Sequence, residues 1–280
     1  MTNATSCAAS GGTFTGTKAT SGGTQSVSPT ITTIYTLSCT GAGGTTNQTT
    51  TVTVSGGSGR TIEVRTLSQL YSAFSSEQSG DTIVIYPDGS PYTLNSTALA
   101  LDQPNITVRG ATSNRNDVII RGDAMSSSAT IKMIFLIDAD AADDLTIKDL
   151  SVGRVGWHAI KFSGENNAGD NSIIDNVRFF DTYEQMLKVS DTGGTSTDNV
   201  SVKNSLFEYT AGVGPQYYIG GIDAHRSTGW IVQDNTLRDI QSPSGSVAEP
   251  AIHFWDDTAG TGNNVVERNT ICLLYTSRCV

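Results

Sequence analysis

Four short segments of the chain share one pattern of apolar and polar residues, and the polar positions carry groups that could do chemistry. The segments are Ala159-Ile-Lys-Phe-Ser163, Met186-Leu-Lys-Val-Ser190, Gly221-Ile-Asp-Ala-His225 and Ala251-Ile-His-Phe-Trp255. Because side chains alternate along a β-strand, the second and fourth residues of each segment should face the core, and the third and fifth should face outward. Strands stacked about 4.8 Å apart would then form two outward columns. The columns are Lys161, Lys188, Asp223, His253 and, beside them, Ser163, Ser190, His225, Trp255.

The first column has the groups that β-elimination of a uronic-acid glycan requires. That reaction needs a base for the proton beside the carboxylate, and positive charge to neutralise the carboxylate itself. Lys161 and Lys188 would lower each other's affinity for a proton, which favours one as the base and leaves the other to hold the carboxylate. Asp223 could orient the imidazole of His253 or His225 as an acid or base. The four residues of the first column are therefore the predicted catalytic residues.

Aromatic and acidic residues near this column are predicted to bind the substrate. Trp255 offers a stacking platform for a sugar ring, and His225 precedes it in the second column. Tyr217 and Tyr218 lie on a loop beside the predicted groove and could donate protons, and Glu249 lies on another such loop. The loops expected to wall the groove span residues 191–198, 211–219 and 241–250.

Other interpretations remain open for these residues and their neighbours. Lys188 beside Asp223 could be an ordinary surface ion pair, and such pairs are common and weak. Trp157-His158 fits the core or rim of the fold, and Glu184-Gln185 could reach the groove edge. Asp256-Asp257 could bind Ca²⁺, although two adjacent acids mostly mark a solvated turn. No other set of metal ligands is predicted, and no HExxH, P-loop, GxGxxG or GxSxG motif is present.

A repeat positions these segments within residues 60–271. Each unit has an apolar strand, an Asn or Asp at its end, and a second apolar strand; the polar residues are Asp149, Asn176, Asn204, Asn235 and Asn269. They are 27, 28, 31 and 34 residues apart, which is typical of stacked units rather than of a closed globule. Asn suits a sharp turn between strands because its side chain can bond nearby backbone, and stacked Asn side chains can bond each other. A helix over 67–74 and a strand over 81–86 should open the region.

Residues 60–271 resemble the right-handed parallel β-helix family that includes the pectate lyases. The helix followed by the segment Gly80–Tyr92 resembles the entry cap of that fold. Three further stretches are similar to a subgroup of bacterial β-helix repeat proteins: Gly214-Pro-Gln-Tyr-Tyr218, Gly220-Gly-Ile-Asp-Ala-His225 and Ser242-Pro-Ser-Gly-Ser-Val-Ala-Glu249. The resemblance implies an all-β fold with a right-handed parallel β-helix and a polysaccharide partner, but a shared fold does not fix the chemistry.

Residues 1–55 resemble part of a bacterial immunoglobulin-like domain common in secreted proteins. The matching stretches are Asn3-Ala-Thr-Ser-Cys7, Gly11-Gly12, Gly16-Thr-Lys18, Thr33-Ile-Tyr-Thr-Leu-Ser-Cys39 and Thr40-Gly-Ala-Gly-Gly44. In that family the two cysteines form a disulfide, which implies a Cys7–Cys39 bridge here, and the family's first strands are missing from this partial domain. Strands are expected over 33–37 and 49–54, with a turn over 41–47. Residues 56–59 are predicted to be a flexible linker.

The last nine residues, 272–280, break the repeat. Cys272-Leu-Leu-Tyr-Thr-Ser277 resembles the translation of a transposon end sequence that is ligated to DNA in sequencing libraries. We therefore interpret residues 272–280 as an artefact and expect the natural β-helix to continue beyond Ile271. A native C-terminal strand is the alternative.

Composition and charge narrow the function further. The net charge is −10 and there is no basic patch, which argues against nucleic-acid binding because phosphates must be neutralised by Lys and Arg. No run of 18 or more apolar residues is present, so no membrane span is predicted. The N-terminus lacks the features of a signal peptide. The implied disulfide and both resemblances nevertheless favour a secreted or cell-surface protein whose signal peptide is missing from this fragment. The protein is expected to be a monomer.

Three functions fit these observations. The first is a polysaccharide lyase that acts on an acidic glycan through Lys161, Lys188, Asp223 and His253. The second is a non-catalytic glycan-binding or adhesion module that uses the same face, and the third is a structural spacer. An open groove walled by loops would favour the first two functions, whereas side chains paired flat on the surface would favour the spacer.

Overall fold

The protein has an all-β fold with large parallel sheets and divides into two compact units, Met1–Ser58 and Gly59–Val280. The computed structural model describes residues 4–27, 29, 33–52, 59–191, 195–243, 248–255, 262–273 and 278–279. Residues 56–58 of the predicted linker and the pair Asp256-Asp257 lie outside the described residues, as do parts of two predicted groove loops, 192–194 and 244–247.

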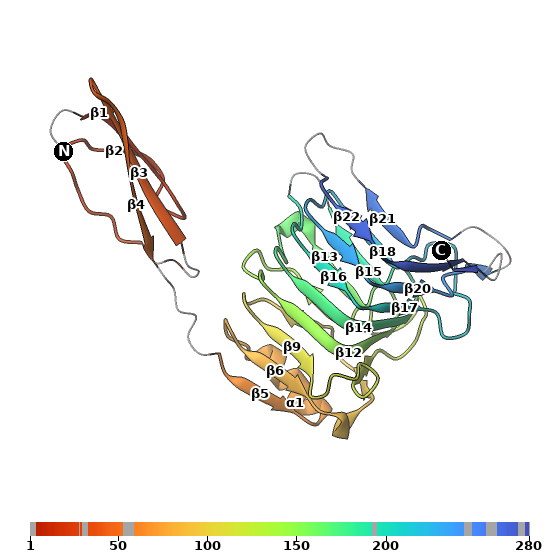
Figure 1. The fold of residues 1–280 in the computed structure, drawn as a ribbon. Helices are drawn as coiled ribbons and strands as arrows, with labels where there is room; N and C mark the ends of the chain where they lie inside the picture. Colours follow the sequence, from red (N-terminus) through yellow and green to blue (C-terminus); the bar gives the residue numbers. More distant parts are fainter. Residues whose placement is uncertain are drawn as a thin grey trace. The chain divides into compact units, whose positions relative to one another are not determined.

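The first unit is a four-stranded antiparallel sheet in the order β2-β1-β3-β4 (Figure 1). Its strands are β1 (Ala4–Ser10), β2 (Gly16–Lys18), β3 (Thr33–Gly41) and β4 (Gly44–Val52). Cys7 lies opposite Cys39 on neighbouring strands, and the two form the disulfide that the resemblance implied. Both cysteines are buried, together with Ala9 and Tyr35.

The turn expected over residues 41–47 is wrong in extent. β3 and β4 pair continuously from Thr33 opposite Val52 to Gly41 opposite Gly44, so only two residues connect them. Gly44 has a φ of 110°, a value that glycine adopts without steric cost, and this conformation permits the tight reversal. The Thr-rich flanks then pair as strand, because threonine favours the extended backbone.

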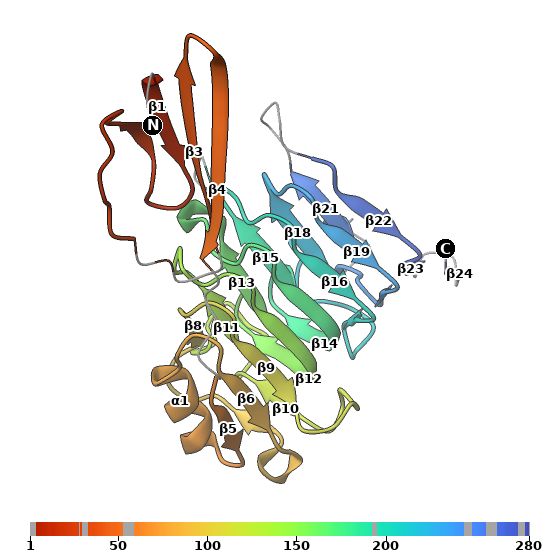
Figure 2. The same ribbon diagram turned by 60° about the vertical axis from the view of Figure 1, so that its left-hand side comes forward.

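The second unit is a coil of mainly parallel strands that form one 14-stranded and one 6-stranded sheet (Figures 1 and 2). The 14-stranded sheet has two arms, joined through the long strands Thr146–Val155 and Ile173–Thr182, and these arms are called the first and second sheets below. The 6-stranded sheet is called the third sheet. The first sheet has β5 (Thr61–Val64), β6 (Thr82–Ile85), β9 (Thr107–Gly110), β12 (Thr146–Val155), β14 (Ile173–Thr182), β16 (Ser201–Lys203), β19 (Ile231–Gln233) and β22 (Val265–Glu267). The second has β7 (Tyr92–Thr93), β10 (Ile119–Arg121), the later halves of β12 and β14, β17 (Leu206–Glu208), β20 (Thr236–Arg238) and β23 (Thr270–Leu273).

The third sheet is the one that carries the predicted catalytic column. Its strands are β8 (Leu99–Leu101), β11 (Phe135–Ile137), β13 (Ile160–Ser163), β15 (Leu187–Ser190), β18 (Ile222–His225) and β21 (Ile252–Trp255). Figure 2 shows these strands side by side. A short strand, β24 (Arg278–Cys279), pairs antiparallel with β23, and the interpretation of residues 272–280 as an artefact stays a prediction.

Alternation along the strands builds one continuous core inside the coil. The inward residues of the first sheet form a column that is at most 1% exposed: Ile83, Val108, Ile147, Ile174, Val202 and Val232. Aromatic rings stack in the same way, and the rings of Phe179 and Phe207 lie nearly parallel with centroids 4.4 Å apart. Trp230 is fully buried and meets the ring of Phe162 edge-on.

The polar corner between the first and second sheets agrees with the sequence in three turns and differs in the last two. Asp149, Asn176 and Asn204 adopt left-handed backbone conformations, with φ between 51° and 59°, and the amide of Asn176 donates to Asp149 at 2.7 Å. In the next turns this conformation belongs to Asp234 and Arg268 instead. The expected corner residues there, Asn235 and Asn269, lie one position later and bond inward, each donating to a backbone carbonyl of the preceding turn.

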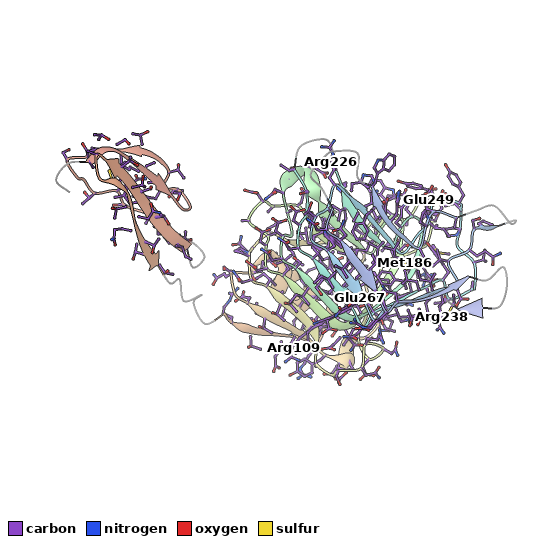
Figure 3. All side chains as sticks on the ribbon, turned by 45° about the horizontal axis from the view of Figure 1, so that its top comes forward. Arg109, Met186, Arg226, Arg238, Glu249 and Glu267 are labelled. Carbon is purple, nitrogen blue, oxygen red and sulfur yellow. A yellow bond between two sulfur atoms is a disulfide. The ribbon has the colours of Figure 1, made fainter. Side chains whose placement is uncertain are left out.

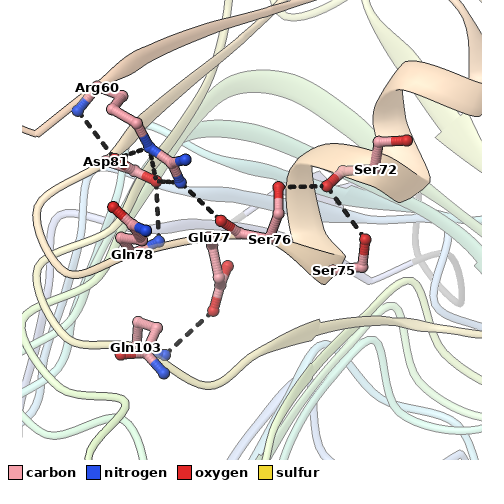
Figure 4. A network of polar contacts seen from close by, with 8 residues as sticks. All are labelled: Arg60, Ser72, Ser75, Ser76, Glu77, Gln78, Asp81 and Gln103. Atoms are coloured by element: carbon pink, nitrogen blue, oxygen red, sulfur yellow. Dashed lines mark hydrogen bonds and ion pairs between the residues drawn. The ribbon is translucent and has the colours of Figure 1, made fainter.

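The predicted helix, α1 (Leu67–Ser75), covers the first turns of the coil. Thr66 caps its N-terminus by accepting a bond from the Gln69 amide, and the helix buries Leu70, Ala73 and Phe74. The ring of Phe74 stacks on that of Phe135 with centroids 5.6 Å apart. The residues after the helix are held by a polar network in which Arg60 bonds the buried carboxylate of Asp81 and the Ser76 carbonyl (Figure 4).

The carboxyl group of Asp143 should make the free energy of unfolding of the coil depend on pH. Its carboxyl accepts from the Asp170 amide at 2.9 Å, and burial followed by the charge of Asp170 raises its pKa to about 6. A raised pKa means that the folded state holds the proton more tightly than the unfolded chain, so stability is greatest at low pH and is lost as pH rises through 6. Asp143→Asn keeps the acceptor and should be more stable than the parent at pH 8, by about 1 kcal/mol after solvent screening.

Urea denaturation at pH 5 and pH 8 measures this effect. The matched control is Asp144→Asn, which removes the same charge from the exposed neighbouring residue and should give a smaller gain. An equal gain from both variants would show that net charge, and not the burial of Asp143, is responsible.

Candidate active site

Strand register places the four predicted catalytic residues in one row across the third sheet. Lys161 pairs with Lys188 between β13 and β15, Lys188 with Asp223 between β15 and β18, and Asp223 with His253 between β18 and β21. The second column also follows this register, with Ser163 opposite Ser190 and His225 opposite Trp255. The juxtaposition is therefore present in the structure, whereas the catalytic roles stay predictions.

Lys188 and Asp223 form a buried pair at the centre of the row. They are only 7% and 5% exposed, so the pair is not the ordinary surface ion pair that the sequence left open. Lys188 Nζ bonds Asp223 Oδ2 and lies 2.8 Å from His225 Nε2. An ammonium group can only donate, so His225 Nε2 is the acceptor in this contact when it carries no proton.

The sequence analysis expected Lys161 and Lys188 to lower each other's affinity for a proton, but each lysine also has an acidic partner in the structure. The charged group that contacts Lys188 is the carboxylate of Asp223, which offsets the repulsion from Lys161. Lys161 has its own partner, because its Nζ lies 3.4 Å from Glu165 Oε1 and 3.2 Å from Ser163 Oγ. Sequence reasoning missed Glu165, which stands in the turn after β13 and also accepts from Ser190 Oγ at 2.5 Å.

The carboxylate of Asp223 faces both histidines of the cluster. Its Oδ1 lies 3.4 Å from His225 Nε2 and 3.3 Å from His253 Nδ1. Burial alone would raise the pKa of Asp223, but the interactions with His225 and Lys188 outweigh it and hold this pKa at about 2. Oδ1 is buried and has no aligned hydrogen-bond donor among the described residues. Asp223 is therefore ionised at neutral pH and keeps an acceptor for an imidazole N–H.

His253 and Trp255 open this cluster to solvent. The side chain of His253 is 34% exposed, so Nε2 can meet a ligand while Nδ1 faces Asp223. Trp255 is 54% exposed, and its ring lies 5.2 Å from that of His225 and 5.9 Å from that of His253. This is the position that a stacking platform beside the imidazoles requires.

The remaining predicted substrate-binding residues lie on the side of the row where the strands begin. Tyr217 and Tyr218 are exposed and Glu249 is partly buried; the Glu249 amide donates to the Tyr217 carbonyl at 3.2 Å, which stacks these loops one turn apart. Figure 3 shows Glu249 near the outer edge of the unit. Burial raises the pKa of Tyr218, so its phenol stays protonated at neutral pH. In the described part of the chain, none of the three hydrogen-bonds Lys188, Asp223 or the histidines.

A pocket of about 470 Å³ adjoins the row at Lys161. Its lining residues are Met133, Leu136, Asp138, Trp157, His158, Lys161 and Glu184. Glu184 thus lines this pocket, whereas Gln185 is buried. A larger hollow of about 730 Å³ lies beside α1, away from the row, and is lined mainly by serine, threonine, alanine and leucine side chains.

Comparisons with known proteins assign no family. No family model matches the chain, and no curated protein matches its sequence. Among solved structures, the chain is similar to an alginate lyase from Paenibacillus sp. str. FPU-7, with 19% identity, 75% coverage of each chain and a TM-score of 0.45. A likeness of this size does not assign an activity.

The described residues contain neither a candidate metal site nor a candidate membrane span. No group of three or more His, Cys, Asp and Glu residues in that part of the chain is arranged to hold a metal ion. The possible Ca²⁺ site at Asp256-Asp257 lies outside it. No helix among the described residues is long and apolar enough to cross a membrane.

Proposed function

We propose that the second unit is a right-handed parallel β-helix and that the protein is a secreted polysaccharide lyase acting on a uronate glycan. The contact of Lys188 and both histidines with Asp223 carries this proposal, because it sets cations and a carboxylate-oriented imidazole on one face. The parallel strands that stack in register along both sheets of the second unit support the fold assignment. The first unit fits part of an immunoglobulin-like domain, and its disulfide fits an oxidising compartment.

His253 is the base that the geometry favours. His253 Nδ1 faces Asp223 Oδ1 at 3.3 Å, an acceptor that no other described donor uses. A hydrogen bond formed there when substrate binds would place the proton on Nδ1 and leave the lone pair of Nε2 to act as the base. Nε2 would take the proton from C5 of the uronate. The electron pair left behind forms the C4=C5 double bond while the bond from C4 to the glycosidic oxygen breaks. The leaving oxygen takes a proton from a neighbouring acid, for which the protonated phenol of Tyr218 is the candidate.

The lysines would stabilise the negative charge that develops during this step. The uronate carboxylate spreads the charge of the C5 carbanion, and the ammonium of Lys161, which is more exposed than that of Lys188, can approach it. Lys188 is too buried to approach the substrate in the same way. It contributes by keeping Asp223 ionised and by holding the His225 ring in place. This assignment moves the role of base from the lysines to His253, because Lys188 already donates to two protein groups.

Replacement of His253 tests the proposal. The parent protein should form an unsaturated product with strong ultraviolet absorbance on one of a panel of uronate polysaccharides, assayed with and without Ca²⁺. His253→Ala should slow this reaction by roughly a hundredfold, which is the lower range for loss of a general base. Its thermal unfolding should stay close to that of the parent, because the side chain is one-third exposed.

Lysine variants provide the matched control. Lys161→Met should also lower the rate, whereas Lys203→Met, which removes a lysine from the first sheet, should leave it unchanged. If no polymer yields absorbance but the protein is retained on a uronate column, the glycan-binding module is the better function, and the exposed ring of Trp255 favours it as the second candidate. If neither signal appears, the structural spacer stands.

A further inference from the structure

The pocket beside Lys161 is built by three successive turns of the coil. Trp157 donates its amide to the Lys132 carbonyl at 2.9 Å, and the Glu184 amide donates to the Trp157 carbonyl at 3.1 Å. These bonds fix the lining segments in the same ladder as the strands. A volume of about 470 Å³ falls within the range of small-ligand sites. The pocket is therefore a rigid hollow of suitable size, and Lys161 links it to the catalytic row.

The apolar part of the lining suits the face of a sugar ring. Trp157 is 42% exposed, unlike the fully buried Trp230, and Met133 and Leu136 lie in the same pocket. Aromatic side chains exposed at the rim of a pocket bind ligands that have one apolar face and polar edges. Lys132 approaches the Trp157 ring with its Nζ 5.6 Å from the ring centroid, and its ammonium donates to the Ser127 carbonyl at 2.6 Å.

The buried histidine of the pocket presents an acceptor. His158 Nδ1 lies 2.8 Å from the Gln185 carbonyl, so Nδ1 carries the proton and donates it. Burial lowers the pKa of His158 to about 4, which keeps the imidazole neutral at pH 7. The lone pair of Nε2 is then left on the side of Glu184, whose Oε2 is 3.5 Å away. An anion would need hydrogen-bond donors at this position, whereas the unprotonated Nε2 of His158 can only accept a hydrogen bond.

The charges of the pocket also disfavour an anion. Asp138 and Glu184 contribute two carboxylates, and the one lining ammonium, Lys161, is shared with Glu165. Burial raises the pKa of Glu184, and the charges of Lys188 and Lys132, which act in the opposite direction, do not outweigh it. A uronate would add a third carboxylate to this space. Sugar hydroxyl groups, in contrast, are donors that match the three acceptors.

We propose that this pocket is a second glycosyl subsite and that it takes an uncharged sugar ring. Its ring would stack on Trp157 and donate hydroxyl protons to Asp138, Glu184 and His158 Nε2. This inference rests on the proposed function, in which a uronate binds at the Lys188–Asp223–His253 cluster. The glycan would then contain both kinds of sugar, with the neutral one bound further along the sheet. A substrate made only of uronates would place a charged ring in the pocket.

Tryptophan fluorescence tests the subsite without any need for catalysis. Of the three tryptophans, Trp230 is buried, so a Trp255→Phe variant reports on Trp157 and a Trp157→Phe variant reports on Trp255. The probes are neutral trisaccharides of glucose, mannose and galactose, a mannuronate trisaccharide, and mixed oligosaccharides that contain glucuronate. In Trp255→Phe, a neutral or mixed sugar should change the Trp157 emission at a concentration at least tenfold lower than the mannuronate trisaccharide requires.

Glu184→Gln supplies the charge control in this background. It keeps the size of the side chain but removes one carboxylate. The ratio between the concentrations of mannuronate and of neutral trisaccharide that change the Trp157 emission should therefore fall severalfold. Equal or tighter binding of the mannuronate trisaccharide at Trp157 would overturn the proposal, and so would the absence of any response to the neutral and mixed sugars. A Trp157 response to neutral sugars without any lyase activity would leave the subsite standing and would reject the proposed reaction alone.

Discussion

Replacement of Asp223 by alanine should lower the free energy of unfolding of the second unit by about 3–5 kcal/mol. The side chains of Lys188 and Asp223 are only 8% and 6% exposed, so the variant leaves an ammonium in a poorly solvated site without its counter-charge. Asp223 is also the group that both His225 and His253 face. Urea denaturation followed by the fluorescence of Trp230, which lies in the core between Phe162 and Phe254, measures the loss.

Two control variants separate the buried charge from the loss of packing. The double replacement Lys188→Met with Asp223→Leu removes both charges and should recover most of the stability, because a buried pair can be exchanged for apolar groups at little cost. Asp88→Ala breaks the exposed pair with Arg65 and should cost no more than about 1 kcal/mol. A loss below about 1 kcal/mol in Asp223→Ala would contradict the prediction, because it would show that the buried pair contributes no more to stability than an exposed ion pair does.

Acid should reduce the penalty of this variant. The pKa of Asp223 is lowered in the folded protein to about 2, so its contribution to stability is complete above the pKa of the unfolded chain and is lost as pH falls toward 2. The difference between parent and Asp223→Ala should therefore begin to shrink below about pH 4.

The alignment of the proposed catalytic residues in one row could be predicted from the sequence because it depends on a simple periodicity. Four strands of the third sheet, β13, β15, β18 and β21, alternate apolar with more polar residues. Their apolar residues align Lys161, Lys188, Asp223 and His253 without knowledge of the loops. The observed pairing follows that alignment. One slip of register would have moved every side chain to the other face, and the two-sided pattern excludes such a slip.

The environment of that row could not be predicted in the same way. Alternation indicates that Lys188 and Asp223 face outward, but their burial depends on His225 and on the neighbouring turns, which contribute side chains from distant positions. The tautomer of His158 likewise depends on the carbonyl of Gln185, which is 27 residues away along the chain. Contacts between turns of a coil leave no local sequence pattern when the loops vary in length.

The corner residues show a conflict between local preference and packing. Asn favours the left-handed backbone, so Asn235 and Asn269 were the natural corner residues. In the structure Asp234 and Arg268 take that conformation, although arginine has no preference for it. The Asn side chains instead bond buried backbone: the amide of Asn235 reaches the Val202 carbonyl at 2.9 Å, and its Oδ1 accepts from the Ser205 amide. Satisfying these buried groups outweighs the local preference.

Removal of the disulfide should destabilise the first unit and leave the coil unchanged. Cys7 and Cys39 are 32 residues apart, and closing a loop of this length is worth about 3–4 kcal/mol in the chain-entropy description. The unit has little else to replace that contribution, because β4 is exposed along its whole length. In a Cys7→Ala, Cys39→Ala variant, the amides of β1 and β3 should exchange with solvent a hundredfold or more faster, as measured by hydrogen exchange and mass spectrometry of peptides from these strands.

The second unit provides an internal control for this measurement. All three tryptophans belong to the coil, so its unfolding transition, followed by Trp230, should coincide in the parent and the variant. Reduction of the parent by dithiothreitol should reproduce the faster exchange of β1 and β3, which separates loss of the cross-link from loss of two sulfur atoms. If exchange in these strands is unchanged, hydrogen bonding between β1, β3 and β4 holds the sheet by itself, and the cross-link contributes little. The buried position of both cysteines, in a unit whose described core otherwise consists of Ala9 and Tyr35, argues for the first outcome.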